Sequence, residues 1–111
     1  MQVKPITSNY RYTLSNGTSL QGYVRTTYDE LVAVFGKDGG SGDKVTAEWV
    51  LQFEDGTVAT IYDWKQYETP TGLYDWHVGG NKRTVVALVQ QALDGKIEVV
   101  GVEQQVAYYG A

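Results

Sequence analysis

Residues 45–62 carry the sequence feature that most constrains the fold, an alternating apolar pattern followed by a tight turn. Between residues 45 and 53 every second position is apolar, which predicts a strand buried on one face. Asp55-Gly56 predicts a two-residue turn, because both residues tolerate the positive φ that such a turn needs. We therefore expect a β-hairpin of strands 45–53 and 58–62. Its facing pairs would be Phe53 with Val58, Leu51 with Thr60, and Trp49 with Tyr62.

A second hairpin is predicted around the sequence Ser15-Asn16-Gly17-Thr18. Its strands would cover residues 10–14 and 19–24. A two-residue turn would separate the apolar side chains of the two strands. A three-residue loop with Gly17 in a bulge brings them to one face, so we expect the bulged turn.

Two helices and a last strand complete the predicted elements. Thr27 followed by Glu30 is a capping box, which predicts a helix over 28–35 that ends at Gly36. Asn81 is expected to cap a second helix over 82–93, whose apolar residues recur at helical spacing and which ends before Gly95. Residues 96–102 are predicted to form a strand.

The order of these elements predicts an α+β fold in a single domain, 1–111. We expect one antiparallel sheet of four to five strands, built from two β-hairpin–helix units, with both helices on one face. Residues 37–44 contain three glycines and are expected to form a flexible connector. No Lys-Ser/Thr pair follows them at the spacing of a phosphate-binding loop. The tail, residues 103–111, is expected to be extended or frayed.

The formal charge of −4 is distributed unevenly along the chain. Residues 29–80 hold ten acidic side chains and three lysines, a net charge of −7. This balance argues against wrapping a nucleic-acid backbone, where neutralising phosphates supplies most of the affinity. Ordinary solubility and contact with a basic protein surface both stay open as explanations.

The sequence predicts a cytoplasmic protein. It contains no cysteine, no apolar segment of a secretory signal near its start, and no run of about 18 apolar residues.

The sequence contains few of the residues that common catalytic sites require. A single histidine and no cysteine disfavour Ser–His–Asp and Cys–His sites. Asp75 and His77, with Asp63 or Glu68, could hold a divalent metal. The favoured interpretation of His77 is a hydrogen-bonded structural residue. We therefore predict no enzymatic activity, no metal and no cofactor.

The aromatic segment 63–76 is the first candidate binding site. Tyrosine and tryptophan are enriched at binding hot spots, because they offer a large contact area at low entropic cost. The alternative is that some of these rings cover the core. The predicted partner-binding residues are Asp63, Trp64, Tyr67, Tyr74, Asp75 and Trp76.

The second candidate is an anion or nucleotide site where the chain enters the helix 82–93. Unpaired amides at a helix N-terminus attract phosphate, and neighbouring rings could stack on a base. The alternative is that Gly-Gly-Asn simply turns the chain into the helix. The residues of this site would be His77, Gly79, Gly80, Asn81, Lys82 and Arg83.

The segments FEDGTVATIYDWK (53–65) and YDWHVGGN (74–81), with TTYDELVAVFG (26–36) upstream, resemble small accessory proteins of bacteriophages. The resemblance covers about residues 18–93, and it carries over no catalytic motif. It implies a protein that binds and blocks a host protein, of a defence or regulatory system, in the host cytoplasm. Homo-oligomerisation stays open.

Overall fold

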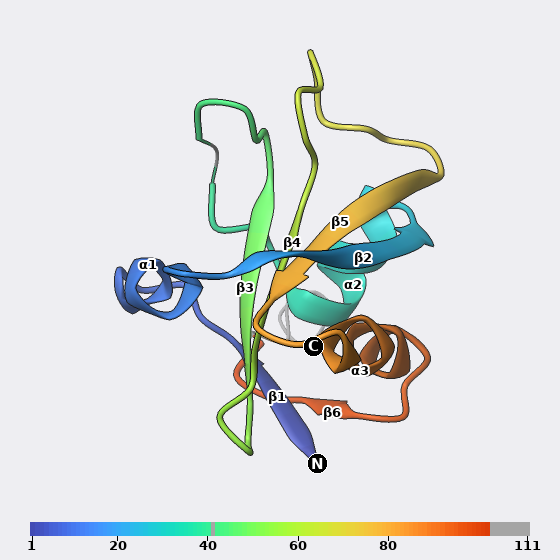
Figure 1. Cartoon of the computed structure of the whole chain (residues 1–111). Coiled ribbons are helices and arrows are strands. Elements are labelled where there is room, and N and C mark those ends of the chain that lie inside the picture. The colour runs from blue at the N-terminus through green and yellow to red at the C-terminus, as the bar shows by residue number, and fades with distance from the viewer. Residues whose placement is uncertain (41, 103–111) are drawn as a thin grey trace, which may run out of the picture.

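A computed structural model describes residues 1–40 and 42–102 of the chain (Figure 1). This part of the chain forms an α+β fold with one open sheet of six strands and three helices. The elements are β1 (Gln2–Pro5), α1 (Tyr10–Ser15), β2 (Ser19–Thr26), α2 (Tyr28–Phe35), β3 (Glu48–Phe53), β4 (Val58–Tyr62), β5 (Tyr74–Gly80), α3 (Thr84–Leu93) and β6 (Glu98–Val99).

The strand order in the sheet is β2-β5-β4-β3-β1-β6. All neighbours are antiparallel except β1 and β6, which are parallel. The prediction of four to five strands in a purely antiparallel sheet was therefore slightly wrong. It missed β1 and β5, and β5 begins within the aromatic segment 63–76, for which no strand was predicted.

The hairpin of β3 and β4 is confirmed, but its predicted register is wrong. The loop contains three residues, 54–56, because the Phe53 amide donates to the Thr57 carbonyl at 2.8 Å. Only Gly56 needs a positive φ (90°), while the Asp55 carboxylate accepts from the Thr57 amide at 2.9 Å and stabilises this turn. The observed pairs are Gln52 with Val58, Leu51 with Ala59, Val50 with Thr60, Trp49 with Ile61, and Glu48 with Tyr62.

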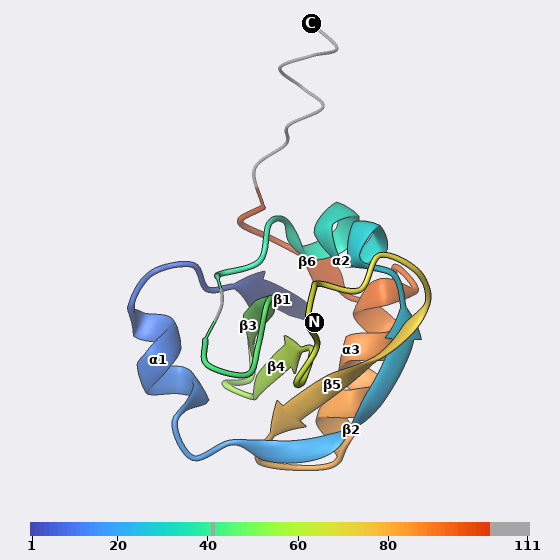
Figure 2. The ribbon, with the colours of Figure 1, turned by 90° about the horizontal axis from the view of Figure 1, so that it is seen from above.

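The predicted first hairpin is wrong. Residues 10–15 form the short helix α1, and β2 pairs with β5 instead. The turn itself exists, since the Thr18 amide donates to the Ser15 carbonyl at 3.1 Å and Gly17 has φ 83°. The chain before this turn lies against β3 and β4 rather than beside β2 (Figure 2). The idea of two repeated hairpin–helix units therefore fails for the first half.

Helices α2 and α3 lie on the same face of the sheet, as predicted, and α1 lies on the opposite side (Figure 2). Thr27 caps α2, with its hydroxyl accepting from the Glu30 amide at 3.1 Å, and Gly36 follows with φ 83°. Gly95, with φ 77°, follows the end of α3. We call the sheet face against α2 and α3 the inner face and the other the outer face. The buried core of the inner face includes Val24, Leu31, Trp49, Leu51, Phe53, Ile61, Trp76, Val78, Val85 and Val89.

The remaining predictions concern the connector and the C-terminal region. The predicted strand 96–102 is reduced to the two residues of β6. Residues 37–40 and 42–44 belong to no helix or strand, and the flexibility of this connector stays a prediction. The predicted frayed tail, 103–111, lies outside the described residues. Within 1–40 and 42–102, no helix has the length and apolarity needed to cross a membrane.

Candidate functional site

A row of aromatic side chains crosses the outer face of the sheet. Trp76 on β5 and Ile61 on β4 belong to the inner face, so the alternating residues His77 and Tyr62 point outward. The strand register sets Tyr23 opposite His77, and His77 opposite Tyr62. Trp64 extends the row beyond the end of β4. We call these four residues, Tyr23, His77, Tyr62 and Trp64, the aromatic row.

The rings of the aromatic row contact one another in sequence. Centroid separations are 4.9 Å from Tyr23 to His77, 5.2 Å from His77 to Tyr62, and 6.4 Å from Tyr62 to Trp64. Such edge-to-face and tilted pairs are favourable arrangements for aromatic rings. Tyr23 remains 51% exposed and Trp64 42%, whereas His77 and Tyr62 are half-buried. The row therefore presents aromatic surface that is already ordered by its own contacts.

His77, in the middle of the row, has a ring nitrogen without a hydrogen-bond partner in the described part of the chain. Its Nδ1 is buried, and no described residue bonds to it. Burial lowers the pKa of His77 below its ordinary value of 6.5, and the Asp63 carboxylate opposes part of this shift. The neutral form of the ring is therefore favoured, and one of its polar atoms is hidden from bulk water.

Glu48 lies at the β3 end of this row, opposite Tyr62. Burial raises the pKa of Glu48, and the Arg11 guanidinium opposes part of that change. Burial also raises the pKa of Tyr62, with a further contribution from the charge of Glu48. The acid and the histidine lie on opposite sides of the Tyr62 ring along the row. This order does not pair them for proton transfer.

Trp64 is flanked by two lysines. The ammonium groups of Lys44 and Lys65 each lie 5.9 Å from the centroid of its ring. The Lys65 amide donates to the Lys44 carbonyl at 2.8 Å, and Lys65 adopts φ 54°, which is uncommon for a residue other than glycine. The Trp64 amide donates to the Tyr74 hydroxyl at 3.3 Å. These contacts hold the exposed tryptophan at the end of the row.

Asp63 ties together the two loops that border the row. Its side chain is fully buried and accepts from the Thr46 amide at 2.7 Å and the Ala47 amide at 3.2 Å. The Thr46 hydroxyl donates to the same carboxylate and lies 2.6 Å from the Thr69 hydroxyl. Segments before β3 and after β4 thus share one buried anchor, because a buried carboxylate needs such donors.

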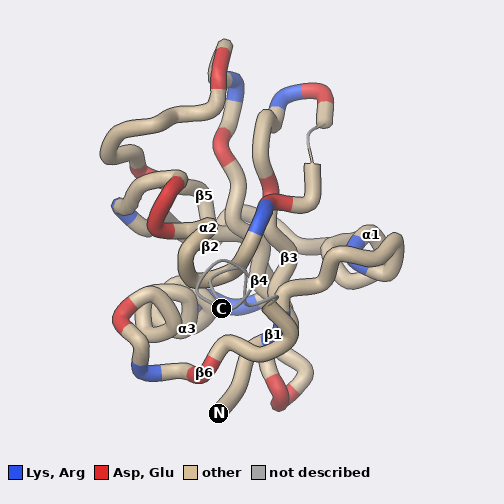
Figure 3. The backbone as a smooth tube through the Cα atoms, turned by 180° about the vertical axis from the view of Figure 1, so that it is seen from behind, with Lys and Arg blue, Asp and Glu red and all other residues tan. Residues whose placement is uncertain are grey.

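The two loops tied by Asp63 project beyond the end of the sheet (Figure 1). One connects α2 to β3 and the other connects β4 to β5. Both carry charges of both signs near their tips (Figure 3). A partner on the aromatic row would therefore meet a mixed-charge rim around an aromatic centre, which is the usual composition of a protein interface.

The predicted partner-binding residues divide into two groups. Trp64 belongs to the row, Tyr67 is fully exposed in the loop between β4 and β5, and Tyr74 is half-buried. Asp75 is exposed, with its carboxylate 3.4 Å from the Arg25 guanidinium. Trp76 and Asp63 have no exposed surface, so neither can touch a partner in this fold. Trp76 was placed at the surface because no strand was predicted at β5, and Asp63 because its distant donors, Thr46 and Ala47, could not be recognised.

The predicted anion site is divided between a strand and a loop. His77, Gly79 and Gly80 lie in β5, which has β2 on one side and β4 on the other. The glycine amides of a central strand are not free to cradle a phosphate. At Gly79 a methyl group would lie only 2.4 Å from the Thr60 hydroxyl, so close packing accounts for this glycine.

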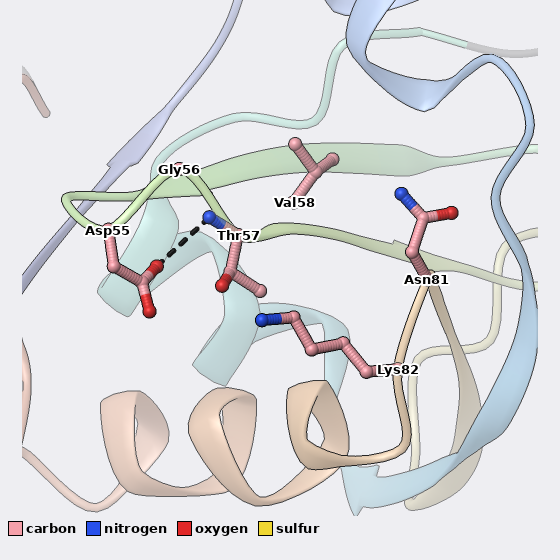
Figure 4. A pocket seen from close by; sticks show the side chains of 6 residues that line it. All are labelled: Asp55, Gly56, Thr57, Val58, Asn81 and Lys82. Atoms are coloured by element: carbon pink, nitrogen blue, oxygen red, sulfur yellow. Dashed lines mark hydrogen bonds between the residues drawn. The ribbon is translucent and has the colours of Figure 1, made fainter.

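Asn81, Lys82 and Arg83 are exposed, but Asn81 does not cap α3. The N-cap position is Arg83, which makes no capping bond through its side chain. Asn81 and Lys82 instead line a hollow with the β3–β4 turn, where the Lys82 ammonium points toward Thr57 and Asp55 (Figure 4). The Thr57 amide lowers the pKa of Asp55 most, and the charge of Lys82 adds to it. The lysine thus already has a carboxylate nearby.

Sequence reasoning did not select Tyr23, Tyr62 or Glu48 as residues of a binding site. A signal for Tyr62 was present. The observed register groups Ala59 and Ile61 with Leu51, a more apolar face than the predicted one with Thr60 and Tyr62. The described residues include no group of three or more acidic or histidine side chains placed to hold a metal ion.

No family model matches this chain, and neither does any curated protein or solved structure. The resemblance to phage accessory proteins therefore stays a prediction.

Proposed function

We propose that the protein is a small, non-enzymatic binding protein that holds another protein against its aromatic row. The observation that supports this most is four contacting rings on a sheet face that α2 and α3 leave open. Isolated exposed apolar residues are normal, but a contiguous aromatic patch with a charged rim marks a binding surface. Tyrosine and tryptophan are also the side chains that dominate binding hot spots.

The resemblance to phage accessory proteins extends this proposal to the kind of partner. In this view the protein is phage-encoded, works in the host cytoplasm, and blocks a host protein of a defence or regulatory system. The order of Glu48, Tyr62 and His77 supports binding over catalysis, because the ring between the two ionisable groups separates them. Mixed charges on the bordering loops suit a protein partner better than a polyanion.

The alternative, a nucleotide- or anion-binding protein using residues 77–83, has less support. Its glycines lie in a central strand, and Lys82 lies toward Asp55. It serves as the second outcome of the test below.

The test starts with capture of a partner from a bacterial host lysate, followed by titration of the purified partner against variants. We expect Trp64→Ala and Tyr23→Ala each to weaken binding by more than about 1 kcal/mol, the usual lower limit for an important interface residue. Tyr10→Ala is the matched control. Tyr10 has nearly the same exposed fraction as Tyr23 (54% against 51%), but it lies in α1, outside the row.

Circular dichroism of each variant checks that the fold is retained. Equal affinities for the row variants and the control would remove the aromatic row as the binding surface. If Lys82→Glu with Arg83→Glu abolished binding of a nucleotide while the row variants had no effect, the alternative function would replace this one.

A further inference from the structure

Strand β2 leaves one long edge of the sheet open. With eight residues it is the longest strand, and no strand within residues 1–40 and 42–102 lies on its far side. Exposed edges invite pairing with another chain, and proteins usually block them by short strands, charged side chains, proline or β-bulges. The opposite edge, β6, follows this rule with only two residues. β2 contains neither lysine nor proline.

One part of β2 is suited to accept a further strand. A bulge at Gln21 interrupts the pairing between Leu20 and Gly22, and the segment 22–26 then pairs with β5 without a break. On the outer face of β2, Leu20 is 46% exposed and Tyr23 is 51% exposed. A regular segment of five residues with exposed apolar side chains beside it is the available pairing surface.

We propose that β2 pairs antiparallel with β2 of a second copy of this chain, with Val24 at the centre of a two-fold axis. Residues opposite each other in an antiparallel pair point to the same face. Tyr23 would then lie opposite Arg25 of the second copy, and symmetry makes this contact twice. A guanidinium over a tyrosine ring is a favourable contact, so the strand complements itself.

Other registers of the same pair fit less well. Centring the axis on Arg25 sets two guanidinium groups opposite each other, which is repulsive. Centring it on Tyr23 sets Arg25 opposite Gln21, where the bulge interrupts the strand. The Val24 register sets neither like charges nor the bulge opposite Arg25, so it is the register that fits the strand.

The resulting dimer has one continuous sheet through both copies, with the two aromatic rows ending on either side of the axis. Its interface consists of one strand pair and two ring–guanidinium contacts, which is small for a permanent dimer. The association is therefore reversible, and the dimer fraction rises with protein concentration.

Disulfide trapping tests the register, because the chain contains no cysteine. Tyr23→Cys mixed with Arg25→Cys should cross-link several-fold faster than either variant alone, since only the mixture sets two thiols directly opposite each other. Thr13→Cys, an exposed position in α1, is the control for random collision. If the mixture cross-links no faster than the single variants or the control, the proposed pairing is wrong.

Light scattering of the wild-type chain over rising concentration tests the dimer itself. We expect the apparent mass to rise toward twice that of one chain, and Tyr23→Lys to keep the chain monomeric by setting an ammonium group opposite Arg25. Circular dichroism confirms that this variant is folded. If the wild-type chain stays monomeric at every concentration, the inference is wrong. The open edge of β2 would then be available only to a strand of a different protein. Both experiments use the protein alone, without a binding partner. A negative result would therefore contradict the dimer without contradicting the proposed function.

Discussion

The two faces of the sheet use aromatic side chains in opposite ways. On the inner face, Trp49 and Trp76 are 2% and 0% exposed, with ring centroids 5.6 Å apart. On the outer face, Tyr23 and Trp64 also contact neighbouring rings but keep about half of their surface exposed. The difference follows from the helices, because α2 and α3 cover one face and the short α1 covers only part of the other (Figure 2).

Aromatic content alone therefore does not separate core from binding surface in this chain. Trp76 and His77 are neighbours in β5, yet one is in the core and the other is in the aromatic row. The strand period of two decides which face each residue takes. A shift of one residue in register would exchange the roles of the two faces.

The largest expected effect is on stability, and it distinguishes the tryptophan of the inner face from that of the outer face. Trp76→Ala should lower the free energy of unfolding by about 3–5 kcal/mol, because it removes a fully buried ring and leaves a cavity. Trp64→Ala, which removes a half-exposed ring, should cost less than about 1 kcal/mol. Chemical denaturation measures both values.

The same pair of variants should reverse its order in partner binding, where Trp64→Ala has the larger effect in material that remains folded. Similar unfolding free energies for the two variants would contradict the assignment of these residues to different faces.

The next effect concerns the buried anchor below the row. Asp63→Ala should cost roughly 2–3 kcal/mol, because it leaves the amides of Thr46 and Ala47 buried without an acceptor. Asp43→Ala is the control, since Asp43 is an exposed acid near the same loops and should change stability by less than about 0.5 kcal/mol. A loss as small as that of the control would mean that Asp63 does not anchor the two loops.

Local signals predicted that α2, α3 and the central hairpin exist, although they missed α1 and the register of the hairpin. Thr27 with Glu30 marked the start of α2, and Gly36 and Gly95 marked where α2 and α3 end. These signals work because capping bonds and positive φ depend on a few adjacent residues. The long alternation of β3 likewise needed no distant partner to be recognised.

Pairing across the sheet was not predictable in the same way. The turn at Asn16-Gly17 suggested a hairpin, but β2 pairs with β5, which lies about fifty residues or more further along the chain. Two glycines in β5 contradicted its strand pattern, although one of them is required by the nearby Thr60 hydroxyl. Four of the six predicted partner-binding residues, Trp64, Tyr67, Tyr74 and Asp75, keep access to solvent, whereas Trp76 and Asp63 do not.

The smallest expected effect is on the pH dependence of stability, and it reports how far water is excluded from the outer face around His77. Burial holds the pKa of His77 below its ordinary value of 6.5, so the unfolded chain binds a proton first as the pH falls. The contribution of His77 to stability is therefore present above pH 6.5 and is lost as the pH falls below it. Since this is the only histidine of the chain, its Cε1 proton can be followed by NMR without ambiguity.

We expect a titration midpoint below 6.5, together with a decline in unfolding free energy below that pH that His77→Gln lacks. Glu48 acts in the opposite direction. Burial raises its pKa above 4.5, so protonation of its carboxyl stabilises the fold as the pH falls through that raised pKa. The comparison with His77→Gln cancels this contribution, because both proteins contain Glu48. A midpoint at or above 6.5 would show that burial does not control the pKa of His77, which contradicts the expectation.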